Sequence, residues 1–223
     1  MTLLFLLIVV AGMPLLAAIS YRNIKTLEAE ETDLKLAKTP VYLQSIIMQG
    51  GMALLAYQVC IKEEYKISFK AGLNTYSFIG ACIFLASSLG FAWISQKFMG
   101  KKNESTLKYL LPENNKERLM WVLAVIVAAF CEEYIYRGVL YQVLLTHTEG
   151  KIWASILLSA IVFGFGHGTQ GEKAIIQIIP FAIGFHVLVI LSDGLMIPMI
   201  VHFVYNISVE LLFGRKIIGQ QHP

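Results

Sequence analysis

Apolar runs long enough to cross a lipid bilayer recur along almost the whole chain, and they constrain its fold more than any other feature. Of the 223 residues, 57% are hydrophobic and 15% are charged, whereas soluble domains carry roughly 25% charged residues. A helix needs about 17 to 25 apolar residues to span a bilayer core. The alternation of polar and apolar residues that is typical of transmembrane barrels is missing from the sequence.

We therefore predict an all-α, polytopic transmembrane helix bundle that forms one integral membrane domain, residues 1–223. About seven spans are expected, at residues 3–19, 41–61, 75–96, 119–145, 152–167, 174–191 and 195–213. The first span lacks a positively charged segment before it, so we interpret it as an uncleaved anchor rather than a secretory signal.

The distribution of Lys and Arg between the loops predicts the orientation of this bundle. With seven spans, 13 of these residues fall on one side of the membrane and 4 on the other. The positive-inside rule then places the N-terminus outside and the C-terminus in the cytoplasm, and we expect a bacterial or archaeal inner membrane. The net charge of +3 is thus a topology signal, and no nucleic-acid partner is indicated.

The fourth predicted span carries two carboxylates and a guanidinium, in the run Cys131-Glu132-Glu133-Tyr134-Ile135-Tyr136-Arg137-Gly138. Charges at such depth cost several kcal/mol on most estimates, so they indicate a functional polar site. Glu133 and Arg137 are four residues apart and share a helix face, where they can pair and leave Glu132 free to react. A charge cluster that only pins helices together is the alternative. Cys131 is a weak candidate nucleophile, because apolar neighbours disfavour a thiolate.

The later spans supply candidate partners for these carboxylates. His167 ends the fifth span, in a glycine-rich stretch that permits close helix approach. His202 and Asn206 share a face of the seventh span, where both side chains can donate to one developing oxyanion. Together the residues suit a hydrolysis with a base, a water and an oxyanion site. The zinc-binding helix pattern His-Glu-x-x-His is absent, but a zinc site built from Glu132, His167 and His202 remains open.

In order along the chain, these segments read Glu-Glu-x-x-x-Arg, Phe-x-x-x-His and His-x-x-x-Asn. They resemble the CAAX protease and bacteriocin-processing family of intramembrane proteases, also called CPBP or Abi, which includes enzymes of the CAAX prenyl protease type 2 kind. The resemblance covers about residues 118–213. The matching residues are Glu132, Glu133 and Arg137; Phe163 and His167; and His202 and Asn206.

The resemblance implies an intramembrane endopeptidase that cuts a membrane-associated substrate, lipidated or leader-bearing. Glu132 and His167 would activate a water, His202 and Asn206 would stabilise the oxyanion, and Glu133, Arg137 and Phe163 would support the base. Family members have been described both as metalloproteases and as glutamate-dependent enzymes without metal. We expect the metal-free version with no certain cofactor, and zinc is the alternative.

The division of the chain follows from where these motifs lie. Residues 118–213 are the expected catalytic core of four helices, and residues 1–117 supply accessory spans and cytoplasmic loops. The competing hypothesis is a non-proteolytic immunity or scaffold protein of the same fold that binds a membrane partner. A proton-coupled transporter is disfavoured, because transporters usually show two pseudo-symmetric halves. The oligomeric state stays open.

Overall fold

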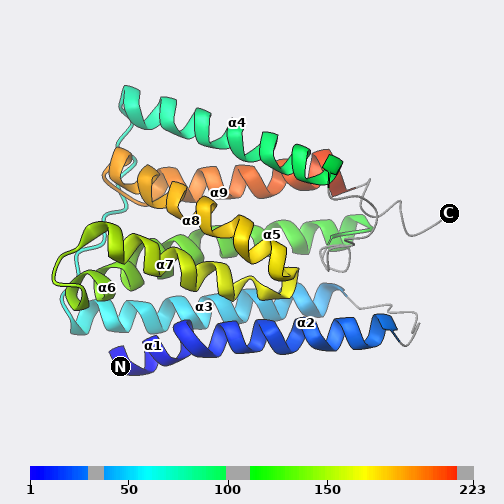
Figure 1. Cartoon of the computed structure of the whole chain (residues 1–223), viewed down its shortest axis with the longest axis horizontal. Helices are drawn as coiled ribbons and strands as arrows, with labels where there is room; N and C mark the ends of the chain where they lie inside the picture. Colours follow the sequence, from blue (N-terminus) through cyan, green and yellow to red (C-terminus); the bar gives the residue numbers. More distant parts are fainter. Residues whose placement is uncertain (30–37, 99–110, 215–223) are drawn as a thin grey trace.

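The computed structural model describes residues 1–29, 38–98 and 111–214, and this part of the chain is a bundle of helices lying side by side (Figure 1). Three of the helical rods contain wider π-helical turns, labelled η1, η3 and η5, and continue through them without a break. In chain order the elements are α1 (Thr2–Leu6), η1 (Leu7–Gly12), α2 (Met13–Ala29), α3 (Lys38–Lys62), α4 (Thr75–Phe98), α5 (Asn115–Glu132), η3 (Glu133–Leu140), α6 (Tyr141–His147), α7 (Ile152–Gly166), the 3₁₀ turn η4 (Gly168–Gln170), α8 (Glu172–Ser192), α9 (Met196–Val209) and η5 (Glu210–Gly214).

The prediction of a polytopic helical membrane protein is confirmed. Six stretches of the described chain are long and apolar enough to cross a membrane: Thr2–Thr26, Lys38–Lys62, Thr75–Ser95, Asn115–His147, Glu172–Ser192 and Met196–Gly214. The helix predicted at residues 152–167 forms with almost the same bounds, as α7, but its 15 residues make it shorter than these six stretches. At 1.5 Å per residue it is about 22 Å long, whereas a bilayer core is about 30 Å thick. The α7 helix is therefore a short apolar helix within the bundle.

Local sequence signals set the ends of two helices that frame the site. Asn114 caps α5, since its Oδ1 accepts a hydrogen bond from the Glu117 backbone N–H at 2.9 Å. The Glu117 carboxylate in turn accepts from the Glu113 N–H at 2.8 Å. Between α8 and α9, Asp193 adopts a left-handed conformation (φ 50°) and Gly194 follows it. Signals within a few residues therefore determine both helix ends.

The η3 segment lies at the centre of the bundle, in contact with α3, α5, α6, α7 and α8. Its apolar side chains form the core together with residues of the four neighbouring helices α3, α6, α7 and α8. The fully or almost fully buried members of this core include Ala56, Val59, Ile135, Tyr136, Val139, Leu140, Val143, Ala160, Phe163 and Ala182. By contrast, α4 packs on α8 and α9 and lies at one edge of the bundle (Figure 1).

A buried lysine fixes the start of α3 against the segment that leads into α5. Lys38 is 7% exposed, and its Nζ donates to the Leu111 carbonyl at 2.7 Å and to Glu113 Oε1 at 2.5 Å. An ammonium group at low exposure needs such partners, because its desolvation is otherwise costly. The two bonds place α3 alongside α5 at a defined register.

Candidate active site

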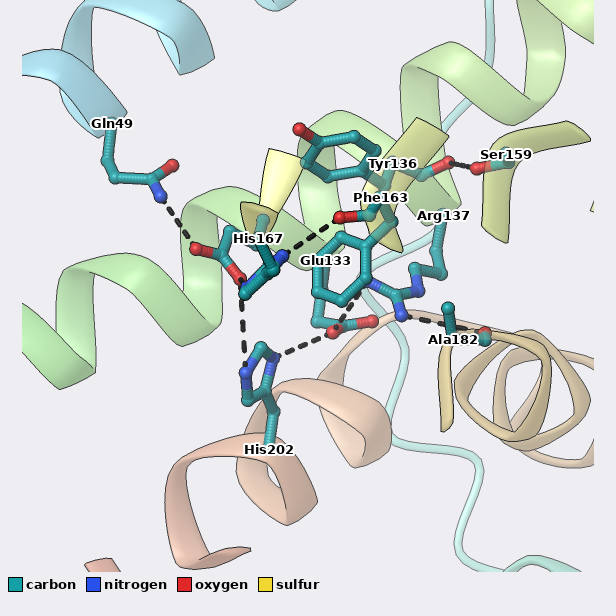
Figure 2. A network of polar contacts seen from close by, with 10 residues as sticks. Gln49, Glu133, Tyr136, Arg137, Ser159, Phe163, His167, Ala182 and His202 are labelled. Atoms are coloured by element: carbon teal, nitrogen blue, oxygen red, sulfur yellow. Dashed lines mark hydrogen bonds and ion pairs between the residues drawn. The ribbon is translucent and has the colours of Figure 1, made fainter. Parts of the chain in front are cut away.

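Three helices bring six of the seven motif residues into one buried cluster (Figure 2). Glu132 ends α5 and is followed by η3, while α7 and α9 approach from two other directions. The clustered residues are Glu132, Glu133, Arg137, Phe163, His167 and His202. The seventh, Asn206, lies one helical turn beyond His202 on α9 and is partly buried. In the described part of the chain its side chain makes no hydrogen bond.

The Glu132 carboxylate faces both motif histidines. Its Oε2 lies 3.8 Å from His167 Nε2 and 3.9 Å from His202 Nε2. Its other oxygen, Oε1, accepts a hydrogen bond of 2.6 Å from the amide of Gln49 on α3. With the residue only 8% exposed, the carboxylate is held inside the protein with one oxygen bonded and the other directed between two rings.

Glu133 forms the ion pair that its spacing predicts. Its Oε1 lies 3.2 Å from Arg137 NH1 and accepts a hydrogen bond from His202 Nδ1 at 2.8 Å. Glu133 and Arg137 are both inaccessible to solvent along their side chains. The attraction between two charges at this depth offsets the cost of removing them from water only if further hydrogen bonds contribute. The His202 ring supplies one such bond to Glu133.

The Arg137 guanidinium lies between two aromatic rings. Its Cζ is 4.2 Å from the Phe163 ring centroid and 5.1 Å from that of Phe185. NH2 also reaches the Ala182 carbonyl of α8 at 3.5 Å. Arg suits such sites because its planar, weakly hydrated cation stacks on aromatic faces. The predicted supporting residue Phe163 therefore contacts the arginine directly.

The hydrogen bonds at Nδ1 define how the two histidine rings are presented. His167 Nδ1 lies 2.9 Å from the Phe163 carbonyl, and His202 Nδ1 lies 2.8 Å from the Glu133 carboxylate. Both partners are acceptors only, so each Nδ1 carries the proton. Each Nε2 is then directed toward Glu132 Oε2, and in the neutral ring it is an acceptor.

Two local features let the elements approach this closely. The π-helical turns of η3 begin at Glu133, directly after Glu132, and such turns occur frequently at functional sites. At Gly164 of α7 a Cβ would collide with the Ile179 side chain and crowd the Ile175 carbonyl of α8. The predicted close approach of helices at this glycine is confirmed.

Two contributors to the cluster were missed by sequence reasoning. Gln49 lies in a span that was expected to be accessory, and Phe185 lies on α8 without a motif residue beside it. For Gln49 a signal exists, since an amide within an apolar span needs a partner. Phe185 gives no such signal, because an aromatic residue on an apolar helix usually indicates lipid contact or core packing.

The residue types at this cluster are ones that bind zinc, but the distances between their ligand atoms are longer than those in a zinc site. Two Nε2 acceptors and a carboxylate oxygen are common zinc ligands, and each ring donates its other nitrogen to an acceptor, as metal-binding histidines do. Ligand atoms around a tetrahedral zinc lie about 3.3 to 3.4 Å apart, compared with 3.8 and 3.9 Å here. Across the described ranges, no group of three or more such side chains is close enough to hold a metal as it stands.

A comparison with known protein families finds a match over the part of the chain that contains this site. Residues 114–208 match the family model described as type II CAAX prenyl endopeptidase Rce1-like. This match supports an assignment to the CAAX protease family. This is a family of proteases, so the match supports a membrane-embedded peptidase. The matched range contains all seven motif residues and ends two residues after Asn206. Searches of curated proteins and of solved structures found no match.

Proposed function

We propose that this CAAX-family protein is an intramembrane endopeptidase that hydrolyses a peptide bond of a membrane-associated substrate, lipidated or leader-bearing. The observation that carries the proposal is the position of Glu132 Oε2, which faces His167 Nε2 and His202 Nε2 at 3.8 and 3.9 Å. These separations are too long for direct hydrogen bonds. They are short enough for one water molecule to bond to the carboxylate and to a ring at the same time.

Glu132 and His167 are the proposed activating pair. A water between them would donate one hydrogen bond to Glu132 Oε2 and a second to His167 Nε2. His167 Nε2 is an acceptor because the proton of the ring is on Nδ1, which donates to the Phe163 carbonyl. Glu132 takes the proton as the water oxygen attacks the scissile carbonyl carbon. The same proton is then delivered to the leaving amide nitrogen as the carbon–nitrogen bond breaks. The carboxylate is regenerated with no net change.

His202 and Asn206 are the proposed oxyanion donors. The Asn206 side-chain amide offers N–H groups one turn from His202 along α9. His202 can donate from Nε2 only when its ring is doubly protonated, because its Nδ1–H is already directed to Glu133. The Glu133 carboxylate, whose charge Arg137 already neutralises, accepts the Nδ1–H of that ring, and the Glu132 carboxylate, 3.9 Å from Nε2, is placed to balance the additional charge. This gives Glu133 an orienting role in addition to its pairing with Arg137.

We propose the metal-free form of this chemistry on the basis of the ligand-atom spacing. Glu132, His167 and His202 would be the residues to hold a zinc ion if one binds. A bound zinc would supply a Lewis acid and an activated water. Either way, Glu132 remains the residue on which cleavage depends.

The experiment that tests the proposal compares the protein termini of host membranes that carry the wild type or Glu132→Gln. New peptide ends that appear only with the wild type would establish proteolysis and identify the substrate. A melting temperature of Glu132→Gln close to that of the wild type is the control for folding. Identical termini, together with a membrane partner that co-purifies equally with both proteins, would support the non-proteolytic scaffold instead.

The proposed orientation places the N-terminus outside and the C-terminus in the cytoplasm. It counts the short helix α7 as one of the crossings, because α7 leads back from the turn after α6 to the start of α8 (Figure 1). It is supported by the excess of Lys and Arg in the loops on one side. Reporter fusions after residues 70 and 214 test it, since these positions are expected on opposite sides. Activity of an externally active reporter at residue 214 would overturn the orientation.

A further inference from the structure

Gln49 donates a hydrogen bond to one carboxylate oxygen of Glu132, the proposed base, so that the other oxygen faces the two histidines. Its Nε2 donates to Glu132 Oε1 at 2.6 Å, and Figure 2 shows Gln49 and His202 on opposite sides of the polar cluster. Glu132 ends α5, 83 positions later in the chain. The contact therefore joins the two halves of the protein at the site itself.

A donor at Oε1 has two consequences for a buried carboxylate. It fixes the rotation of the carboxylate plane, so that Oε2 points between His167 and His202. It also satisfies one oxygen of a carboxylate on a residue that is only 8% exposed, where an unpaired polar atom would be costly. Bonds to ionised groups are roughly twice as strong as those between neutral groups.

The packing of α3 holds Gln49 in place, so its hydrogen bond to Glu132 is a fixed feature of the site. One turn further along α3, Met52 and Ala53 pack against the η3 core, followed by Ala56 and Val59. At the start of the same helix, Lys38 is bonded to the segment before α5. Rotation or sliding of α3 would break both sets of contacts.

We propose that Gln49 is a positioning residue for Glu132, so that the working catalytic unit includes α3 as well as the family-matched range 114–208. The expected change in kcat rests on the proposed endopeptidase function. The expected change in chemical labelling of Glu132 does not, because it is measured without a substrate.

The kinetic test replaces the amide with a side chain of similar size that cannot donate. Gln49→Met is expected to lower kcat about tenfold to a hundredfold, the range that corresponds to losing one hydrogen bond to a charged group. KM should stay within about twofold, because the lost contact is to the base and not to the substrate. Gln44→Met is the matched control, since Gln44 lies on the same helix and is exposed. The full-length protein is used throughout, in detergent or in membranes.

The second test measures Glu132 directly with dicyclohexylcarbodiimide, a hydrophobic reagent that modifies carboxyl groups inside membranes and should react more readily once Gln49 no longer holds Oε1. Mass spectrometry of the labelled protein should show more modification at Glu132 in Gln49→Met than in the wild type or in Gln44→Met. Labelling of Glu210, a buried carboxylate on α9 and η5, should not change. If Gln49→Met is unstable, Gln49→Leu serves in its place, because it is also apolar and of similar size and cannot donate a hydrogen bond.

The outcomes separate this inference from the proposed function. Raised labelling of Glu132 supports the positioning role, even if no proteolysis is found and the proposed function fails. Unchanged labelling with unchanged kcat in a proteolytically active protein overturns the positioning role and leaves the function standing. Equal losses of activity in Gln49→Met and Gln44→Met would also overturn it, since they would reflect a general effect on α3.

Discussion

Replacement of Arg137 by Met tests whether the buried charge pair holds the site together. The substitution keeps an unbranched side chain of similar length and removes the cation. Arg137 contacts Glu133 at 3.2 Å, reaches the Ala182 carbonyl at 3.5 Å and lies between the rings of Phe163 and Phe185. All of these contacts are inside the protein, so water cannot replace them.

The expected loss follows from the burial of Glu133. Removing one partner of a buried pair costs about 3 to 5 kcal/mol, because the other charge stays buried without compensation. Here the lower end applies, since His202 Nδ1 still donates to Glu133. For a protein of this size, 1 kcal/mol shifts the melting temperature by roughly 2 to 4 °C. A loss of about 3 kcal/mol therefore lowers the melting temperature by about 6 to 12 °C.

The assay is the melting temperature in detergent, followed by intrinsic fluorescence at one fixed scan rate. Lys70→Met is the control, because Lys70 pairs with Asp193 at 3.6 Å while both side chains are largely exposed, and surface pairs contribute little. The double variant Arg137→Met with Glu133→Gln should recover part of the loss, since the unpaired charge is gone. A melting temperature of Arg137→Met equal to that of Lys70→Met would refute the reasoning.

Three further predictions test the oxyanion site, the metal-free chemistry and the packing of α4. Asn206→Ala should lower kcat about a hundredfold to a thousandfold with a normal melting temperature, as loss of an oxyanion donor does; unchanged turnover would remove it from the site. Cleavage should continue after treatment with a chelator, and loss of activity that zinc restores would contradict this. Gly184→Ala should destabilise the protein by about 1 to 3 kcal/mol, because a Cβ there would collide with the Phe84 ring of α4. Gly51→Ala, where a Cβ meets open space, should not destabilise it, and equal effects of the two substitutions would contradict the packing argument.

Much of the architecture could be predicted because it depends on local patterns. Apolar runs of sufficient length identify membrane helices, and six of the seven predicted spans have counterparts among helices long enough to cross. The cap at Asn114 and the turn at Asp193 follow from signals within a few residues. The Glu133–Arg137 pair follows from a four-residue spacing along one helix, and it forms.

The α7 helix shows where a local pattern was not enough. Its sequence is apolar throughout, so hydropathy predicts a span at residues 152–167. The observed helix has nearly these bounds, Ile152–Gly166, but its 15 residues are fewer than a straight crossing of the bilayer core needs. An apolar sequence therefore predicted the helix and its ends, and did not by itself show that the helix is long enough to span.

By itself the sequence determined a helical membrane protein with carboxylates, histidines and an arginine concentrated in its C-terminal half. Only the tertiary structure decided how those groups meet. It showed that Glu132 Oε2 faces two rings, that Gln49 occupies Oε1, and that Arg137 lies between Phe163 and Phe185. The physical reason is that spacing along one helix defines a face, whereas contacts between helices depend on their relative rotation and register. Those are set by packing around η3, to which residues from the whole chain contribute.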